Sequence, residues 1–243
     1  MLITIITSKI LSTKHKVVIV APMRPHRGIG HALSVVKPLR AEQFFVLNNV
    51  KIFGVNGTPC DCVGLALDKL LKSKPDLIIS GIDHHHNRGE TIYSSGVVSA
   101  AISGTMHGVP SIALSASAED TKSEKEFLRV ARNFNKKLPN IMKMLKPDTT
   151  LNVNYPRRVL SPVLKVVGLT LKNMNTSYTR EVNPFGREFY WMSSDLFDYT
   201  PKTPDYQGDI YWLNMGNVTI TPLKYDLTSP EGQAVLADSG ISL

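Results

Sequence analysis

Short apolar runs alternate with helical patterns over the first part of the chain. Residues 17–21, 76–80 and 109–114 are apolar on both faces, as the buried strands of a parallel sheet are. Between them, residues 63–71 and 97–106 repeat their apolar positions at helical spacing. This alternation predicts an α/β fold with a parallel sheet.

The flanking segments have weaker patterns. Residues 33–39 and 44–55 alternate as β-structure does, and Asn48-Asn49 is the expected hairpin turn. A long amphipathic helix is predicted over residues 123–145. Residues 2–10 fit either a short strand or a helix face, and the pattern alone does not decide between them.

The pattern of predicted elements changes near residue 156. β-like stretches separated by polar, proline-rich loops follow at residues 163–171, 187–192 and 217–223. We therefore predict an α/β core over residues 1–155 and a β-rich extension over residues 156–243. The extension is expected to include a long hairpin that reaches a neighbouring subunit.

The polar segment after residues 76–80 is the first candidate site. Gly81 should end the strand, which places Asp83 and Asn87 in a loop at its carboxyl end, where open α/β sheets bind ligands. Ser94, Ser95 and Gly96 then open a helix whose free N–H groups suit an anion. Strand, polar loop and capped helix together predict a phosphate site.

A second polar loop follows residues 17–21 and contains Arg27. We expect it to face the Asp83 loop, so that Arg27 provides a charged anchor for phosphate. Thr58 precedes another predicted helix, with Asp61 three residues later. Thr58 can therefore cap that helix, line the ligand site, or do both.

Composition narrows the classes of protein. The chain has 243 residues, of which 42% are hydrophobic, and a net charge of +8. Its lysines and arginines are scattered, so nucleic-acid binding is not expected, and a phosphorylated small molecule suits the charge better. The two cysteines, Cys60 and Cys62, are not expected to form a disulfide, which suits the cytoplasm. Apolar runs are too short to cross a membrane.

Several stretches resemble the SurE family, the survival-protein nucleotidases. The resemblance lies in Ala21-Pro22 and the loop to Leu33, Gly57-Thr58-Pro59-Cys60-Asp61-Cys62-Val63, residues 75–89 (PDLIISGIDHHHNRG), Tyr93 to Val98, Leu151 to Pro156, and residues 220–228. These six motifs occur in the family's order. The resemblance implies a Rossmann-like core with a C-terminal β-hairpin extension exchanged between subunits of a homodimer or homotetramer.

The same resemblance implies a 5′-nucleotidase that hydrolyses nucleoside 5′- and 3′-monophosphates with Mg²⁺ or Mn²⁺. Such a metal polarises the phosphoryl oxygen and positions the attacking water. In the family its ligands are an Asp-Asp pair after the first strand, a serine and an asparagine. Here the serine position carries Arg27 and the asparagine position carries Asp83.

The Asp-Asp pair has no counterpart in this sequence, so Asp83 is the one carboxylate expected at the metal. The family's first strand and its Asp-Asp turn would occupy more residues than precede Lys16, and we expect a late start of the chain relative to the family. Val97 also replaces a threonine of the family motif. Activity is therefore expected to be impaired, and the catalytic residues are not assigned.

His84, His85 and His86 offer a possible substitute, because imidazoles bind Mn²⁺, Zn²⁺ and Ni²⁺ and His26 and His31 belong to the opposing loop. Consecutive side chains point in different directions, so at most two of the three could share one metal. The plainer interpretation is a solvent-facing polar loop. Three functional classes remain: an active metal phosphatase, a nucleotide- or phosphate-binding protein without activity, and a structural subunit.

Overall fold

The computed structural model describes residues 2–46, 50–117, 124–160, 163–171, 176–192 and 208–239. Its helices are α1 (Leu2–Leu11), α2 (Pro59–Leu65), the π-helical turn η1 (Ala66–Leu70), the 3₁₀ turn η2 (Gly89–Ser94), α3 (Gly96–Met106), α4 (Glu124–Met144), α5 (Asp209–Asn214) and α6 (Pro230–Asp238). Its strands are β1 (Val18–Pro22), β2 (Ala41–Val46), β3 (Val50–Val55), β4 (Ile78–Asp83), β5 (Ser111–Ala116), β6 (Thr150–Tyr155), β7 (Leu164–Val166), β8 (Tyr178–Val182), β9 (Glu188–Met192) and β10 (Val218–Leu223).

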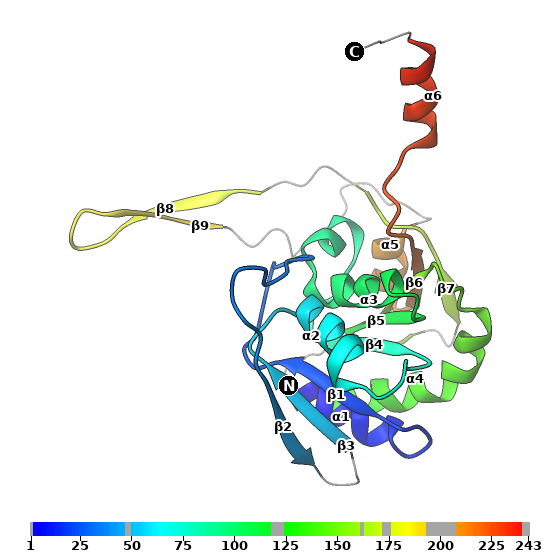
Figure 1. The fold of residues 1–243 in the computed structure, drawn as a ribbon. Helices are drawn as coiled ribbons and strands as arrows, with labels where there is room; N and C mark the ends of the chain where they lie inside the picture. The colour runs from blue at the N-terminus through cyan, green and yellow to red at the C-terminus, as the bar shows by residue number, and fades with distance from the viewer. Residues whose placement is uncertain are drawn as a thin grey trace.

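The main sheet has five strands in the order β4-β5-β6-β10-β7. β4, β5 and β6 are parallel, and β10 is antiparallel to β6. The apolar runs at residues 76–80 and 109–114 predicted β4 and β5 as parallel strands. Every residue of β5 and β6 is buried, because helices cover both faces of the sheet. Helix α4 buries Phe127 and Phe134 on one face, and α3 covers the other (Figure 1). The predicted α/β class is confirmed.

β1 belongs to a second sheet, of order β1-β3-β2. We expected residues 17–20 to lie in one parallel sheet with residues 76–80, but within the described residues β1 pairs with β3 and β4 pairs with β5. β1 and β4 are therefore the facing edges of two separate sheets. The sequence pattern could not show this, because both strands carry the apolar residues of a buried parallel strand.

Other local predictions changed in tertiary context. The amino-terminal segment is helix α1, which packs against α4. Residues 33–39 form no strand, and Val35 and Val36 are largely exposed. β4 does not end at Gly81 but continues to Asp83, and Gly81 has a φ of +121° that favours glycine. The expected turn at Asn48-Asn49 lies outside the described residues.

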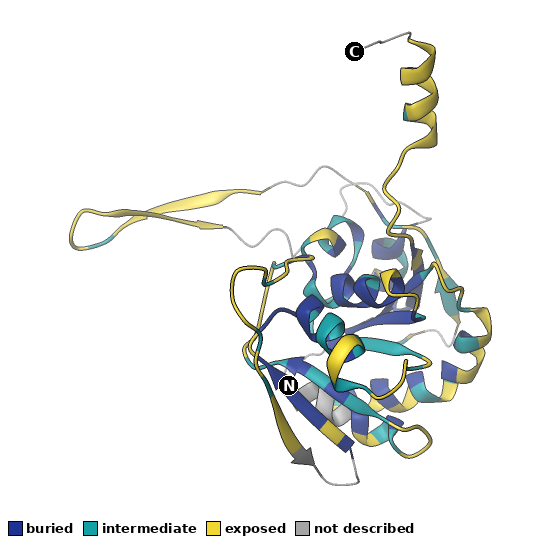
Figure 2. Ribbon diagram, in the orientation of Figure 1, coloured by how far each residue is buried: buried dark blue, intermediate teal, exposed yellow. Residues whose placement is uncertain are grey.

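The carboxyl-terminal part is divided between the body and two projections. β7 and β10 join the main sheet, so residues beyond 156 help to complete the core. The β8–β9 hairpin and helix α6 extend away from the body (Figure 1), and Figure 2 shows both as exposed. We did not expect helices α5 and α6. The boundary at residues 155/156 stays a prediction.

Both cysteines are buried and free, as the sequence predicted. Burial raises the pKa of the Cys60 thiol to about 11 and that of the Cys62 thiol to about 12, with a further contribution from Asp61 beside them. Both thiols are therefore protonated at neutral pH. No helix within the described ranges is long and apolar enough to cross a membrane.

Candidate functional site

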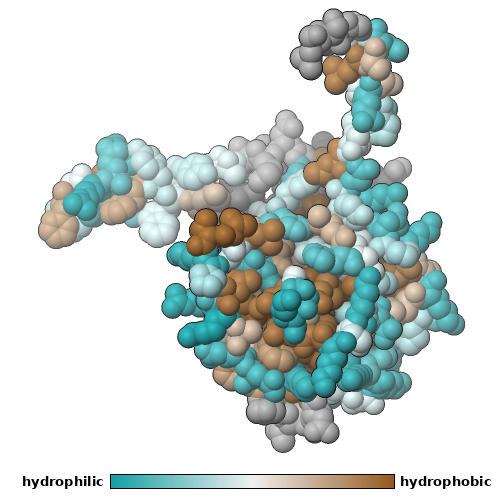
Figure 3. Space-filling model, viewed as in Figure 1, coloured by the Kyte–Doolittle hydropathy of each residue, from teal (hydrophilic) through white to brown (hydrophobic). Residues whose placement is uncertain are grey.

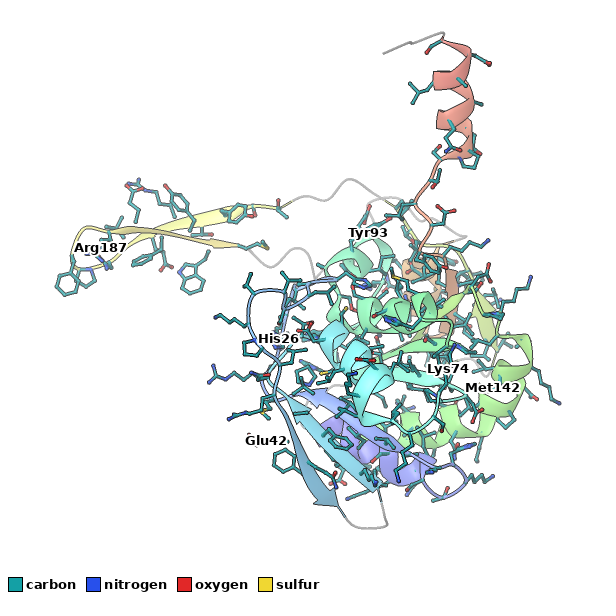
Figure 4. All side chains as sticks on the ribbon, in the orientation of Figure 1. His26, Glu42, Lys74, Tyr93, Met142 and Arg187 are labelled. Carbon is teal, nitrogen blue, oxygen red and sulfur yellow. The ribbon has the colours of Figure 1, made fainter. Side chains whose placement is uncertain are left out.

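The two predicted polar loops lie together at one end of a cavity of about 1400 Å³ between β1 and β4. Strand β1 leads into the loop that carries His26 and Arg27, and β4 ends at Asp83, which His84 follows. The amino-terminal end of α3 contributes Ser95 to the same cavity. Figure 4 labels His26 on the loop after β1. The carboxyl ends of the two strands thus bring together groups from three separate segments, as we predicted.

Arg27 contacts the Asp83 loop directly. Its Nη2 lies 3.0 Å from His84 Nε2. Partial burial and the neighbouring His85 lower the pKa of His84, whereas Asp83 opposes this shift and Arg27 adds to it. The neutral imidazole therefore accepts a hydrogen bond from the guanidinium at Nε2, which places its own proton on Nδ1.

Asp83 and the next two residues form a cluster of possible metal ligands. One carboxylate oxygen of Asp83 lies 3.6 Å from His84 Nδ1 and 3.9 Å from His85 Nδ1. One ligand atom from each of the three residues lies within 4.8 Å of the other two. Among the described residues this is the one group of three or more histidine, cysteine and acidic side chains with that spacing. The interpretation of these two histidines as a purely solvent-facing loop is therefore incomplete.

His86 points elsewhere, as expected for consecutive side chains. Its Nε2 lies 2.8 Å from the carbonyl oxygen of Tyr155 on β6. Burial lowers the pKa of His86 to about 4, although the bond to Tyr155 opposes the shift. The neutral ring donates to this carbonyl and fixes the loop to the sheet.

Asn87 is the anchor of the loop. Its side-chain nitrogen donates to Ser115 Oγ over 2.6 Å, and it lies 3.4 Å from the second carboxylate oxygen of Asp83. Its backbone carbonyl oxygen accepts hydrogen bonds from the side-chain amides of Asn152 and Asn154. We predicted a phosphate contact for Asn87, and it does line the cavity. The contact of its side chain with Asp83 orients that carboxylate.

The serines at the start of α3 have structural partners. Ser95 Oγ accepts a hydrogen bond from the backbone N–H of Val98, which caps the helix. Ser94 Oγ donates to the carbonyl of Thr91. Both line the cavity, so capping and ligand contact remain compatible. A Cβ on Gly96 would lie 3.0 Å from Pro59 and 3.1 Å from Ile29, so a larger residue there would force these side chains to shift by a few tenths of an ångström.

Thr58 lies apart from the other predicted site residues. Its hydroxyl accepts from the N–H of Asp61 and donates to the carbonyl of Ala32, while Asp61 accepts from the N–H of Thr58. This is a complete capping box at the start of α2. Thr58 is not among the residues that line the cavity.

Two partners of Asn87 were absent from the predicted site. Ser115 and Asn154 lie on β5 and β6 and are fully buried. Ser115 directly follows the predicted strand at residues 109–114, and Asn154 belongs to the stretch from Leu151 to Pro156. The available signal was a polar residue at the carboxyl end of an apolar run. His31 also differs from expectation, because it does not line the cavity that His26 lines.

The fold and the site define a class: an α/β protein with a group of possible metal ligands and an arginine at the carboxyl ends of its strands. The family described as Survival protein SurE matches residues 2–181. The chain belongs to the SurE family.

Named relatives agree with this assignment. The chain is 34% identical over 221 residues to "5'-nucleotidase SurE" of Thermoanaerobacter sp. (strain X514), covering 90% of this chain and 85% of the relative. It is 35% identical over 230 residues to the protein of that name from Solidesulfovibrio magneticus, covering 94% and 88%. The crystal structure of the Sure protein from Aquifex aeolicus matches with a TM-score of 0.74 and 30% identity, over 97% of this chain and 93% of that one.

The capping role of Thr58 can be tested by substitution. Thr58→Ala removes two hydrogen bonds at the start of α2, and we expect it to lower the free energy of unfolding by about 1–2 kcal/mol. Thr13→Ala removes one solvent-exposed hydrogen bond, to the carbonyl of Ile10, and should change it by less than about 0.5 kcal/mol. Urea denaturation measures both. Phosphate affinity should be the same in Thr58→Ala as in the parent. A clear loss of affinity would show that Thr58 also contacts the ligand.

Proposed function

We propose that this chain is a metal-dependent phosphomonoesterase for nucleoside 5′- and 3′-monophosphates, with weak activity. The observation that carries the proposal is the meeting of Arg27, Asp83, His84 and the start of α3 at one end of a single cavity. The names of the relatives, 5'-nucleotidase SurE, support the reaction. Two free, buried cysteines support a place in the cytoplasm.

The ligand cluster fits one transition-metal ion. Asp83 supplies a carboxylate oxygen and His84 and His85 supply imidazole nitrogens, a set that suits Mn²⁺ or Zn²⁺ better than Mg²⁺, which prefers oxygen ligands. When bound, the metal would polarise a phosphoryl oxygen and lower the pKa of water. Asn87, which lies against the second oxygen of Asp83, would hold the carboxylate in place.

Arg27 opposes metal binding at this cluster. While His84 Nε2 accepts from Arg27, the proton of the neutral ring sits on Nδ1, the nitrogen that faces Asp83. A metal at Nδ1 would require the proton to move to Nε2 and the guanidinium to withdraw. Two cations would also repel each other across the short distance. We infer that Arg27 favours phosphate binding without metal, at the expense of hydrolysis.

The first test is catalytic. Because one carboxylate and a competing arginine leave the metal weakly held, we expect slow or no release of phosphate from AMP, even at millimolar Mn²⁺. A colorimetric phosphate assay with and without a chelator measures this. Robust Mn²⁺-stimulated hydrolysis would contradict the proposed impairment, whereas nucleotide binding without any hydrolysis would favour the inactive, phosphate-binding alternative.

Arg27→Ser should change two affinities in opposite directions. Loss of the charge-assisted hydrogen bond should weaken phosphate binding in the presence of a chelator by roughly 1–3 kcal/mol. The same change frees His84 and removes a cation, so Mn²⁺ should bind more tightly. Calorimetry measures both affinities.

Arg24→Ser is the matched control, because Arg24 is an exposed arginine of the same loop that does not line the cavity. It removes the same charge, so any change it shares with Arg27→Ser reflects net charge alone. Equal changes of the two affinities in both variants would contradict a specific role of Arg27. Weaker Mn²⁺ binding in Arg27→Ser would show that Arg27 does not compete with the metal.

We further propose that the chain forms a homodimer or homotetramer by exchange of its extension. All described residues of β8 and β9 are exposed, and they include Phe189, Tyr190 and Trp191. Helix α6 buries none of its residues and exposes Val235 and Leu236. Apolar side chains on two projecting elements support a partner that covers them.

Light scattering should give at least twice the 26.9 kDa mass of one chain. Trp191→Asp places a charge on the hairpin and should shift the mass towards that of one chain, whereas Tyr225→Asp, at another exposed aromatic residue, should not. A monodisperse parent of 26.9 kDa at micromolar concentration would exclude the exchanged extension.

A further inference from the structure

β1 and β4 each present one edge without a strand beside it. Within the described residues β1 pairs only with β3, and β4 pairs only with β5. Alternate backbone N–H and C=O groups of both strands therefore point towards the space between the two sheets without a ladder partner. Open edges of this kind are templates for another strand.

The two open edges run in the same direction. Their carboxyl ends meet where Arg27, five residues after β1, contacts His84, the residue after β4. At the other end the cavity is lined by Lys16, before β1, and Lys74, before β4. Figure 4 shows His26 and Lys74 at opposite ends of this region. A strand parallel to one edge would be parallel to the other.

The space between the edges is the cavity of about 1400 Å³, and every residue of β1 and β4 lines it. Most pockets for small ligands have volumes of roughly 300–1000 Å³. β5 is fully buried, whereas five of the six residues of β4 are only partly buried, as Figure 2 shows. β4 has the apolar sequence of an inner strand, but its outer edge lies beside a gap.

Apolar side chains line the cavity from helices on both sides of the sheets. Leu11 of α1 and Met142 of α4 come from one side, and Val63 of α2 and Leu67 and Leu70 of η1 come from the other. Figure 3 shows apolar surface on the face of the body that carries α2 and α3. An occupant must be apolar on both faces, as an inner strand of a parallel sheet is.

We propose that this gap is an acceptor site for one extended, apolar β-strand, which adds between β1 and β4 and joins the two sheets into one. A strand of five or six residues matches the five residues of β1 and the six of β4. It would supply hydrogen bonds along both edges, about 17–20 Å long, which a compact ligand could not do. Aliphatic side chains on alternate faces would contact the two helical layers.

The carboxyl end of the added strand would lie beside Arg27, Asp83 and Ser95, so the residue after it would join the candidate site. In this respect the acceptor site extends the proposed function. Strand binding itself requires neither metal nor nucleotide. Strand binding is therefore measured in a chelator and without nucleotide. A chain that binds the strand need not be a phosphatase, and a chain that is a phosphatase need not bind the strand.

The test uses the full chain and the synthetic peptide acetyl-Lys-Val-Leu-Val-Ile-Val-Lys-amide, with hydrogen–deuterium exchange as the readout. We expect saturating peptide to slow exchange at least about tenfold in the segments that contain β1 and β4, and to leave the β8–β9 hairpin unchanged. The matched control is the same peptide with alternate backbone nitrogens methylated, which keeps the side chains but removes donors from one edge. It should give no such protection.

A substitution in the cavity wall provides a second test. Met142→Arg places a charge in the lining and should weaken peptide binding at least about tenfold, whereas Met144→Arg, at an exposed position of the same helix, should not. Circular dichroism checks that both variants fold, and the exchange experiment on the parent stands without them. Three results would overturn the proposal: no protection of β1 and β4, equal protection by the methylated peptide, or protection confined to β2 or the hairpin.

Discussion

The hydrogen bonds of Asn87 are the interaction on which the candidate site depends. Its side chain binds Ser115 on β5, and its carbonyl oxygen accepts from Asn152 and Asn154 on β6. These bonds hold a polar loop against buried strands, where an unpaired amide would be costly. Because the contact also reaches Asp83, the position of the possible metal ligand is set by the same anchor.

Electrostatics then determines what the site can bind. One carboxylate, two imidazoles and a guanidinium lie close together, and on the proposed function the guanidinium and a metal ion would compete at His84. The partners of Ser95 and Ser94 are within the protein, so the start of α3 contributes mainly backbone N–H groups and the helix dipole to an anion. On the proposed function, this arrangement would therefore bind an anion better than a cation.

Because the cavity lies between the edges of two sheets, it differs from a pocket for a small ligand. A parallel sheet is stable when each inner strand has partners on both sides and helices on both faces. β4 is covered by helices but pairs with only one strand among the described residues. β1 faces its open edge, runs in the same direction and has an open edge of its own. The site thus lies at the end of a gap in the sheet, and the two features cannot be understood separately.

The sequence by itself determined the α/β class, the strands β4 and β5, and the capped start of α3, because these follow from local periodicity and side-chain chemistry. It also placed Arg27 opposite the Asp83 loop, since carboxyl ends of parallel strands meet at one edge. Only the tertiary structure decided that Thr58 completes a capping box and that Ser115 and Asn154 hold Asn87. Only the tertiary structure showed that β1 and β4 have open edges, because strand pairing joins residues distant in sequence and leaves no periodic signal.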